Sequence, residues 1–340
     1  MTAPHLRLAL VGDVMLGRLV NDFLAAKPAE WFWGTALPLL RGADAVLANL
    51  ECAVTAHDKP WARSPKVFHF RANPSAVEVL KAGNVRFVSL ANNHVLDFET
   101  QGLLDTLDHL DRADIHHAGA GRDLAAAKAP AMLSLGGQKL GVLAVTDNQP
   151  DFAAGPDIPG THYARLGVDA ALPAEIRGAA AELREAGADI VVLTAHWGPN
   201  MVTDPPPHFR AFARDLADDG SIDLFWGHSA HVFQGVEARG KSLILYDSGD
   251  FIDDYAVDPW LHNDWSFIFL LDIVAGRIER LGLVPVVLTL AQVNLAEGSR
   301  AAEICTRMQA AAARLGTELT PTPEGLELVL GEPQSEASSR

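Results

Sequence analysis

The sequence predicts an α/β protein in which several strands end in clusters of polar side chains. Short apolar runs, typical of buried strands, alternate along the chain with longer segments of helical periodicity. Five of the apolar runs end abruptly in Asp, Asn, Glu or His residues. Open α/β sheets bind their ligands at such strand ends, so the recurrence indicates one composite site.

Length and composition are those of a globular protein with a large core: 340 residues, 49% hydrophobic and 21% charged. The formal net charge of −16 argues against nucleic acid or an anionic membrane as a partner, because both favour a positive protein surface. It does not exclude a small anionic substrate, since bound metal ions reverse the local field. The N-terminal apolar run is too short for a signal peptide, and no run is long enough to span a bilayer. We therefore expect a cytoplasmic protein.

We expect residues 1–331 to form a single domain, which residues 275–331 extend with strands and a helix, and residues 332–340 to form a disordered tail. The runs expected as strands are residues 6–11, 43–47, 88–91, 140–145, 189–195, 223–226, 242–246, 266–273 and 277–290. The expected helices are residues 20–40, with an interruption near Pro28, and residues 75–82, 101–113, 173–186, 208–216 and 300–315.

The first two strands end in side chains that carry oxygen. Asp13 follows Gly12 directly after the first strand, where it either begins a turn or presents its carboxylate to a ligand. Asn49 and Glu51 follow the second strand. In an extended segment they point to the same face while Leu50 points away, so two oxygen-bearing groups converge on one spot.

The third strand ends in Asn92, Asn93 and His94, followed by Asp97. A single Asn at this place is explained by capping of the next helix. Capping accounts less well for an imidazole and a carboxylate that arrive together. We therefore interpret the cluster as part of the site.

Two later strands end in histidines. His196 follows the most apolar strand of the chain, and His228 and His231 lie three residues apart beyond a short strand and a glycine. One such histidine is explained by packing, whereas the pair together with His196 is not. Imidazoles at strand ends add nitrogen ligands to the oxygen ligands of the earlier clusters.

Basic residues lie close to these clusters in sequence. Arg18 follows Asp13 within the next turn, and the loop of residues 55–73 carries Lys66 and Arg71 among its basic residues. Such a loop is either exposed to solvent or binds an anionic substrate, and the sequence leaves both interpretations open.

The collected side chains suit divalent metal chemistry. Carboxylate, amide oxygen and imidazole ligands fit Mn, Zn or Fe, and the lack of thiolates argues against a structural zinc site. A pair of ions needs a bridging carboxylate, for which Glu51 is the candidate; such a pair activates a water and stabilises both reacting oxygens of a displacement at phosphorus. His94, oriented by Asp97, would protonate the leaving oxygen. The phosphate oxygens would be held by Arg18, or by Lys66 and Arg71.

Five motifs together resemble those of the CapA family over roughly residues 5–275: G-D-V-M-L-G-R (12–18), N-L-E (49–51), A-N-N-H-x-x-D (91–97), H-W-G (196–198) and G-H-x-x-H (227–231). The namesake of this family takes part in poly-γ-glutamate capsule synthesis, and the family belongs to the calcineurin-like metallophosphatase superfamily. The resemblance implies that superfamily's fold, a sandwich of two packed mixed β-sheets flanked by helices.

The resemblance also implies two sets of metal ligands. One ion would be held by Glu51, Asn93, His196 and His228. The other would be held by Asp13, Glu51 and His231.

Several positions depart from the pattern of the superfamily or of its capsule-type members. Met15 stands where the superfamily has a histidine, so one metal site should be the weaker, and Asn49 is a conjectured substitute ligand. The last motif is one residue longer than Gly-His-x-His, which moves His231. Asn200 stands where capsule-type members often have Glu, and Asp250 stands in place of the Asn of Gly-Asn-Phe. We assign Asp250 to substrate binding.

Three functions are compatible with these residues. The first is hydrolysis of phosphate monoesters or diesters by a metal-activated water. The second is a metal-dependent amide or γ-glutamyl hydrolase or transferase of poly-γ-glutamate metabolism, because polarising a carbonyl needs the same ligands. The third is a non-catalytic component of capsule biosynthesis, a hypothesis suggested by the loss of a ligand at Met15. The expected substrate is a small or polymeric anion.

Overall fold

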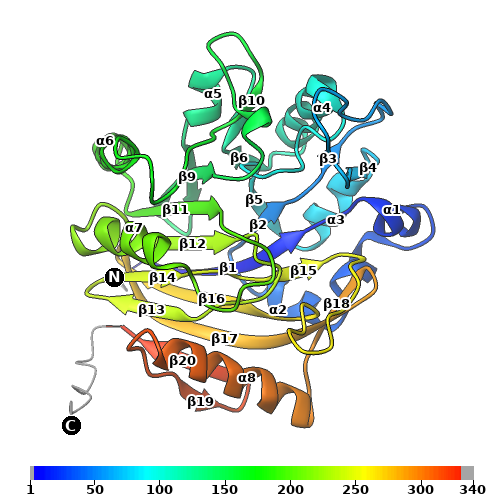
Figure 1. Cartoon of the computed structure of the whole chain (residues 1–340). Helices are drawn as coiled ribbons and strands as arrows, with labels where there is room; N and C mark the ends of the chain where they lie inside the picture. Colours follow the sequence, from blue (N-terminus) through cyan, green and yellow to red (C-terminus); the bar gives the residue numbers. More distant parts are fainter. Residues whose placement is uncertain (1–3, 331–340) are drawn as a thin grey trace.

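The computed structural model describes residues 4–330 of the chain (Figure 1). Two mixed β-sheets pack against each other, and helices lie on the outside of the sandwich (Figure 1). The fold class expected from the sequence, two packed mixed sheets flanked by helices, is confirmed. The tail expected over residues 332–340 lies outside the described residues.

The first sheet has ten strands. They are β1 (His5–Val14), β2 (Ala45–Leu50), β5 (Val85–Ser89), β6 (His116–Ala118), β15 (Asp250–Ile252), β16 (Trp265–Val274), β17 (Arg277–Thr289), β18 (Gln292–Leu295), β19 (Thr320–Thr322) and β20 (Gly325–Val329). The main path runs β19-β20-β17-β16-β1-β2-β5-β6, while β15 pairs with β1 and β18 pairs with β17.

The second sheet has six strands. They are β8 (Ala131–Leu135), β9 (Gln138–Thr146), β11 (Ile190–His196), β12 (Leu224–His228), β13 (Val236–Arg239) and β14 (Ser242–Leu245), in the order β13-β14-β12-β11-β9-β8. Two small sheets pair β3 (Ala53–Val54) with β4 (Arg71–Ala72) and β7 (Ala120–Gly121) with β10 (Gly160–Thr161).

Eight α-helices connect or flank these strands within residues 4–330. They are α1 (Arg18–Leu24), α2 (Leu37–Arg41), α3 (Ala76–Ala82), α4 (Glu99–Arg112), α5 (Leu124–Lys128), α6 (Leu172–Glu185), α7 (Pro207–Asp218) and α8 (Gly298–Ala313). Two 3₁₀ segments cover Ala29–Ala36 and Pro150–Phe152.

The central strands are apolar on both faces, which explains their continuous apolar runs. In β1, Leu8 belongs to the core between the two sheets, whereas Ala9 belongs to the core under the outer helices. In β11, Val192 faces the first of these cores and Val191 packs with residues of α6 and α7. The period of two along each strand thus builds three apolar layers from two sheets.

Parallel pairing brings the polar strand ends to one place. In the first sheet Asp13 of β1 is the register partner of Asn49 in β2, and also of Asp250 in the short parallel strand β15. In the second sheet His196 at the end of β11 is the partner of His228 at the end of β12. Because the carboxyl ends of parallel strands share an edge, each sheet delivers a row of ligand-type side chains.

Most expected strands and helices are present with shifted ends. The third expected strand, residues 88–91, instead covers Val85–Ser89, and the long helix expected over residues 20–40 is divided into α1, a 3₁₀ segment and α2. The strands after residue 275 pair with the first sheet through β16 and β17. The assignment of residues 1–331 to a single domain stays a prediction.

The close approach of β1 and β15 makes Gly12 sensitive to substitution. A Cβ atom at Gly12 would lie 1.7 Å from the carbonyl oxygen of Gly249, which accepts a hydrogen bond from the Asp13 N–H. We expect Gly12→Ala to lower the free energy of unfolding by about 1–3 kcal/mol or more, as overpacking does, measured by urea denaturation.

The matched control is Gly178→Ala, at a position of α6 where the added Cβ meets nothing within 4 Å. This change is expected to stabilise the protein by about 0.5–1 kcal/mol, because Ala is favoured over Gly within a helix. Unfolding of Gly12→Ala at the wild-type urea concentration would contradict the close pairing of β1 with β15.

Candidate metal centre

The polar clusters at the strand ends meet in one site formed by both sheets. Two overlapping groups of side chains have ligand atoms within 4.8 Å of one another: Asp13, His196 and His228; and Asp13, Glu51, His231 and Asp250. All of them are buried except His231, which is partly buried. The six residues come from four strands and two strand-end loops that lie far apart in the sequence.

The first group has spacings close to those of atoms that share one metal ion. Asp13 Oδ1 lies 3.7 Å from His228 Nδ1 and 4.0 Å from His196 Nδ1. The two imidazole Nδ1 atoms lie 2.9 Å apart. Two ligand atoms at about 2.0–2.1 Å from one zinc ion are separated by about 3 Å, so these side chains are arranged around a common point.

The orientation of His228 is fixed by the strand beside it. Thr194 Oγ1 of β11 lies 2.9 Å from His228 Nε2. When this hydroxyl oxygen accepts a hydrogen bond from Nε2–H, the lone pair of Nδ1 points to Asp13. Such a partner on the far ring nitrogen is the usual support of a metal-binding histidine.

Both imidazoles of the first group are held in the neutral form. Burial lowers the pKa of His228 to about 3. Burial, and then the neighbouring His228, lower the pKa of His196 well below its ordinary value. The neutral imidazole is the form that binds a metal ion.

The second group is dominated by carboxylates. His231 Nδ1 lies 2.8 Å from Asp250 Oδ1 and 3.7 Å from Asp13 Oδ2. Glu51 completes this group, and its Oε1 also lies 3.8 Å from His196 Nε2. Asp13 therefore directs one oxygen toward each group, whereas Glu51 approaches His196 at Nε2, the ring nitrogen that is not close to Asp13 and His228.

The longer Gly-His-x-x-His motif is accommodated by unusual backbone. Ser229 and His231 have φ angles of 116° and 59°, in the left-handed region that non-glycine residues rarely adopt. These conformations bring His231 to the carboxylates in spite of the extra residue. Burial alone would lower the pKa of His231, but Asp250 and the other carboxylates around it raise the pKa well above its ordinary value.

The carboxylates of the second group fit a divalent cation. Three of their oxygens are buried and lack a hydrogen-bond partner: Asp13 Oδ2, Glu51 Oε1 and Asp250 Oδ2. Burial, and then Glu51, raise the pKa of Asp13 well above its ordinary value, and burial raises the pKa of Asp250 to about 6. Such buried anions are costly unless a cation compensates them, and carboxylate with imidazole is a donor set that divalent metals accept.

Asn49, expected as a substitute ligand, has other contacts. Its Nδ2 donates a hydrogen bond of 2.7 Å to Asp13 Oδ1, and its Oδ1 accepts one of 3.0 Å from Asn92 Nδ2. Both ends of the amide are occupied, so Asn49 orients Asp13. Met15 is buried in the hydrophobic core, where its Sδ accepts a hydrogen bond from the Gly17 N–H.

His94 and Asp97 form the dyad expected from the sequence. His94 Nδ1 lies 2.6 Å from Asp97 Oδ2, and the ring stacks on Phe70 with centroids 3.9 Å apart. Asp97 is held in turn by the Phe70 N–H and by Lys66, whose Nζ lies 3.3 Å from Oδ1. The other nitrogen of His94, Nε2, lies 3.9 Å from Glu51 Oε1. A restrained imidazole thus borders the second group.

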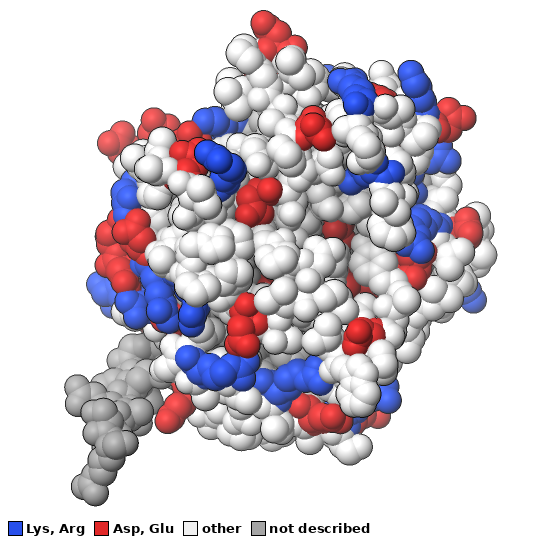
Figure 2. All heavy atoms as spheres, viewed as in Figure 1, with Lys and Arg blue, Asp and Glu red and all other residues white. Residues whose placement is uncertain are grey.

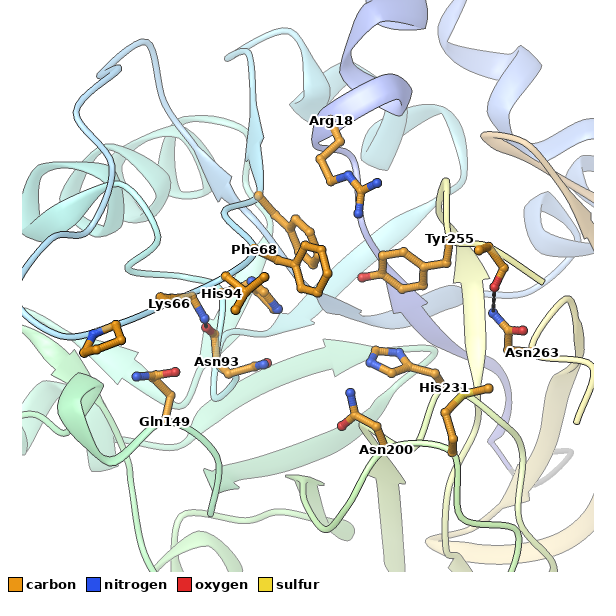
Figure 3. A pocket seen from close by; sticks show the side chains of 15 residues that line it. Arg18, Lys66, Phe68, Asn93, His94, Gln149, Asn200, His231, Tyr255 and Asn263 are labelled. Atoms are coloured by element: carbon orange, nitrogen blue, oxygen red, sulfur yellow. Dashed lines mark hydrogen bonds between the residues drawn. The ribbon is translucent and has the colours of Figure 1, made fainter. Parts of the chain in front are cut away.

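A cavity of about 590 Å³ opens next to the two groups. Figure 3 shows Lys66, Asn93 and His94 on one side of it and Arg18, Tyr255 and His231 on the other. Asn93 Oδ1 is buried without a hydrogen-bond partner in the described structure. On the face in Figure 2, acidic and basic side chains surround an area of uncharged surface.

The three expected anion-binding cations have different surroundings. Lys66 lines the cavity and donates a hydrogen bond to the carbonyl oxygen of Asn93. Arg18 also lines it, and its Nε lies 3.3 Å from Asp254 Oδ2. Arg71 instead donates to the carbonyl oxygen of His57, with its guanidinium over the ring of Phe98. The structure therefore brings Lys66 and Arg18 to the cavity and turns Arg71 to the loop beside it.

The roles of several residues of the site were not predicted from the sequence. Asp250, assigned to substrate binding, lies among the possible metal ligands. Tyr255 donates a hydrogen bond of 3.0 Å to Glu51 Oε2, and burial and the charge of Glu51 raise its pKa well above the ordinary value. Thr194 and Asn92 act through hydrogen bonds to His228 and Asn49. The role of Asp250 could have been inferred from the acidic residues after Gly249, because a carboxylate beside a buried strand needs a compensating partner.

Comparisons with known proteins agree with the resemblance noted in the sequence. The family described as bacterial capsule synthesis protein PGA_cap matches residues 7–255. This chain belongs to the PGA_cap family. Within it, the PGA biosynthesis protein CapA of Bacillus subtilis is 33% identical over 250 residues, which cover 72% of this chain and 63% of that protein. A probable polyglutamine synthesis accessory protein of Mycobacterium tuberculosis is 31% identical over 360 residues, covering 93% of this chain and 94% of its relative.

This PGA_cap family member is also similar to solved structures. A 5'-nucleotidase precursor from Thermus thermophilus has a TM-score of 0.47 at 13% identity, covering 92% of this chain and 59% of that one. The calcineurin-like phosphoesterase YfkN from Bacillus subtilis has a TM-score of 0.45 at 12% identity, covering 92% and 98%. Among residues 4–330, none of the helices has both the length and the apolar character needed to cross a membrane.

We expect a divalent metal ion to raise the melting temperature more at about pH 8 than at about pH 5. The pKa of Asp250 rises from 3.8 to about 6 on folding. The stability that its protonated form gives the metal-free protein is therefore lost as the pH rises through this interval, whereas a cation compensates the ionised form. A ligand that binds only the folded state adds about 2.7 kcal/mol at 100 times its Kd.

The measurement is thermal unfolding of chelator-treated protein with and without MnCl₂ at both pH values. Chelator-treated protein without added metal is the control at each pH. A metal-induced shift that is equal at the two values, or larger at the acidic one, would contradict the role of the buried carboxylates.

Proposed function

We propose that this protein is a metal-dependent hydrolase of phosphate monoesters or diesters that uses two divalent metal ions, Mn, Fe or Zn. The observation that carries the proposal is the pair of overlapping ligand groups beside a cavity that also contains His94. Phosphoryl transfer depends on positioning and charge stabilisation, which such a site supplies. The cytoplasmic location expected from the sequence stays a prediction.

The two groups of neighbouring side chains and the unpartnered oxygen of Asn93 suggest the ligands of each ion. We assign one ion to Asp13, Asn93, His196 and His228, and the other to Asp13, Glu51 and His231. Asp13 has one oxygen near each group of side chains and would bridge the two ions, a role that the sequence suggested for Glu51. Two divalent ions supply Lewis acidity and lower the pKa of water. The unpartnered oxygens of Asn93 and of the carboxylates support these assignments.

The proton for the leaving group comes from His94 in this proposal. Its Nδ1 is held by Asp97, so Nε2 faces the cavity and transfers its proton to the departing oxygen. Lys66 and the Phe70 N–H hold Asp97, which keeps the imidazole in one orientation. Arg18 and Lys66 attract the anionic group of the substrate.

A second candidate function is hydrolysis or transfer at a γ-glutamyl amide. The names of the Bacillus subtilis and Mycobacterium tuberculosis relatives refer to PGA biosynthesis and polyglutamine synthesis, which favours a polymer of glutamate or glutamine residues as the substrate. The same ligands polarise a carbonyl oxygen. The third candidate function is a non-catalytic role in capsule synthesis, for which no turnover of either substrate is expected.

A substrate panel separates these candidates. Protein loaded with Mn²⁺ or Zn²⁺ is expected to hydrolyse aryl phosphate esters and leave γ-glutamyl anilides intact. Glu51→Gln and His196→Ala are expected to abolish turnover while circular dichroism shows a folded protein, because each removes a group that faces the metal ions. Cleavage of the anilide alone would support the amide hydrolase, and no cleavage by any metal-loaded sample would reject both enzymes.

The role of His94 is tested by changing the leaving group. His94→Gln is expected to lower kcat by about 10²–10⁴-fold for esters of alcohols with a high pKa, since general acid catalysis contributes that much. Esters of p-nitrophenol should be much less affected, because nitrophenolate leaves without a proton. Steady-state kinetics on both esters provide the measurement, and equal losses would contradict a general-acid role.

A further inference from the structure

We propose that Asp250 is a ligand of the second metal ion and that its carboxylate takes the place of the imidazole missing at Met15. This inference rests on the proposed metal centre and extends it by one residue. It also predicts that the ratio of the Mn²⁺ affinity to the Zn²⁺ affinity is higher at the second site than at the first.

The backbone holds Asp250 directly beside Asp13. The strand β15 runs parallel to β1 with Asp13 and Asp250 as register partners. The Asp13 N–H donates a hydrogen bond of 3.0 Å to the carbonyl oxygen of Gly249, and Gly12 allows the two chains to approach closely. The position of Asp250 is therefore fixed by strand pairing, as a ligand position requires.

Met15 supplies nothing to the second group. Its side chain is fully buried among apolar residues, and its Sδ lies 3.0 Å from the Gly17 backbone nitrogen. The Met15 N–H donates to the carbonyl oxygen of Ile252, the last residue of β15. The backbone pairing that places Asp250 in the site thus extends to Met15, just beyond the end of β1, and the Met15 side chain lies in the core.

The free oxygen of Asp250 argues for a ligand rather than an orienting group. Its Oδ1 contacts His231 Nδ1, and its Oδ2 is buried and accepts no hydrogen bond from an N–H group of the described residues, although the buried carboxyl group of Asp253 lies beside Asp250. The ligand atoms of Asp250, Asp13 and Glu51 lie within 4.8 Å of one another. Three buried carboxylates at this distance repel one another, and an acid that served only to orient His231 would not need to face the other two.

The donor sets of the two sites differ in chemical type. The first group contains two imidazoles, whereas the second contains three carboxylates and one imidazole. Imidazole ligands suit Zn²⁺, and carboxylate ligands suit Mn²⁺ and other hard cations. A carboxylate at position 250 in place of an imidazole therefore shifts the second site toward Mn²⁺.

Calorimetric titration of chelator-treated full-length protein with MnCl₂ tests the assignment. The wild-type protein is expected to bind two ions per chain. Asp250→Asn keeps a side-chain oxygen for His231 but removes the charge, and it should bind the second ion more than about 100-fold more weakly, because loss of a mere supporting partner costs about 10–100-fold. Asp254→Asn is the matched control: it removes a buried carboxylate of the same segment that belongs to neither group, and two ions should remain bound.

The possible results distinguish the two levels of the proposal. Two ions in both the wild-type protein and Asp250→Asn, with affinities within about tenfold of each other, would overturn the ligand role of Asp250 and leave the metal centre intact. No ion in the wild-type protein would overturn the proposed function as well. Competition of Mn²⁺ with Zn²⁺ on the wild-type protein needs no substitution: displacement of Zn²⁺ from one site at a lower Mn²⁺ excess than from the other supports the assignment, and displacement from both sites at the same excess would contradict the predicted preference.

Discussion

The concentration of buried carboxylates between the ends of the two sheets is the constraint on which the rest of the site depends. Asp13, Glu51 and Asp250 are all at most 1% exposed, and each has an oxygen without a hydrogen-bond partner in residues 4–330. Buried carboxylates so close together raise one another's pKa, and their repulsion destabilises the fold when no cation compensates it. In the proposed metal centre, a bound divalent cation would compensate this cost, and the neutral imidazoles of His196 and His228 would complete the ligands.

The two sheets provide the rigidity that this arrangement needs. Each ligand stands at or just beyond the end of a strand whose position is set by its hydrogen-bonded neighbours. Further side chains hold the ligands from outside: Asn49 holds Asp13, Thr194 holds His228, and Tyr255 holds Glu51. Loss of such supporting side chains typically weakens metal binding by about 10–100-fold. The side chains that hold the ligands are therefore also needed for tight metal binding.

The sequence predicted the sheets well because their strands are buried on both faces and therefore appear as continuous apolar runs. It predicted the grouping of Asp13, Glu51, His196 and His228 because the ends of parallel strands share an edge. It did not predict the role of Asp250, since β15 has only three residues and pairs with β1, the first strand, which is far away in the sequence. The contacts of Asn49 and Arg71 depend on neighbours that local patterns do not reveal.

A crystal structure of the Mn²⁺-loaded protein, with anomalous diffraction data at the manganese edge, would show directly whether the carboxylate cluster binds metal ions. Two anomalous peaks are expected, one among Asp13, His196 and His228 and one among Asp13, Glu51, His231 and Asp250. Diffraction locates the ions independently of any substrate, so the result holds for each candidate function. The absence of any peak at these side chains, in crystals grown with excess Mn²⁺, would contradict the account.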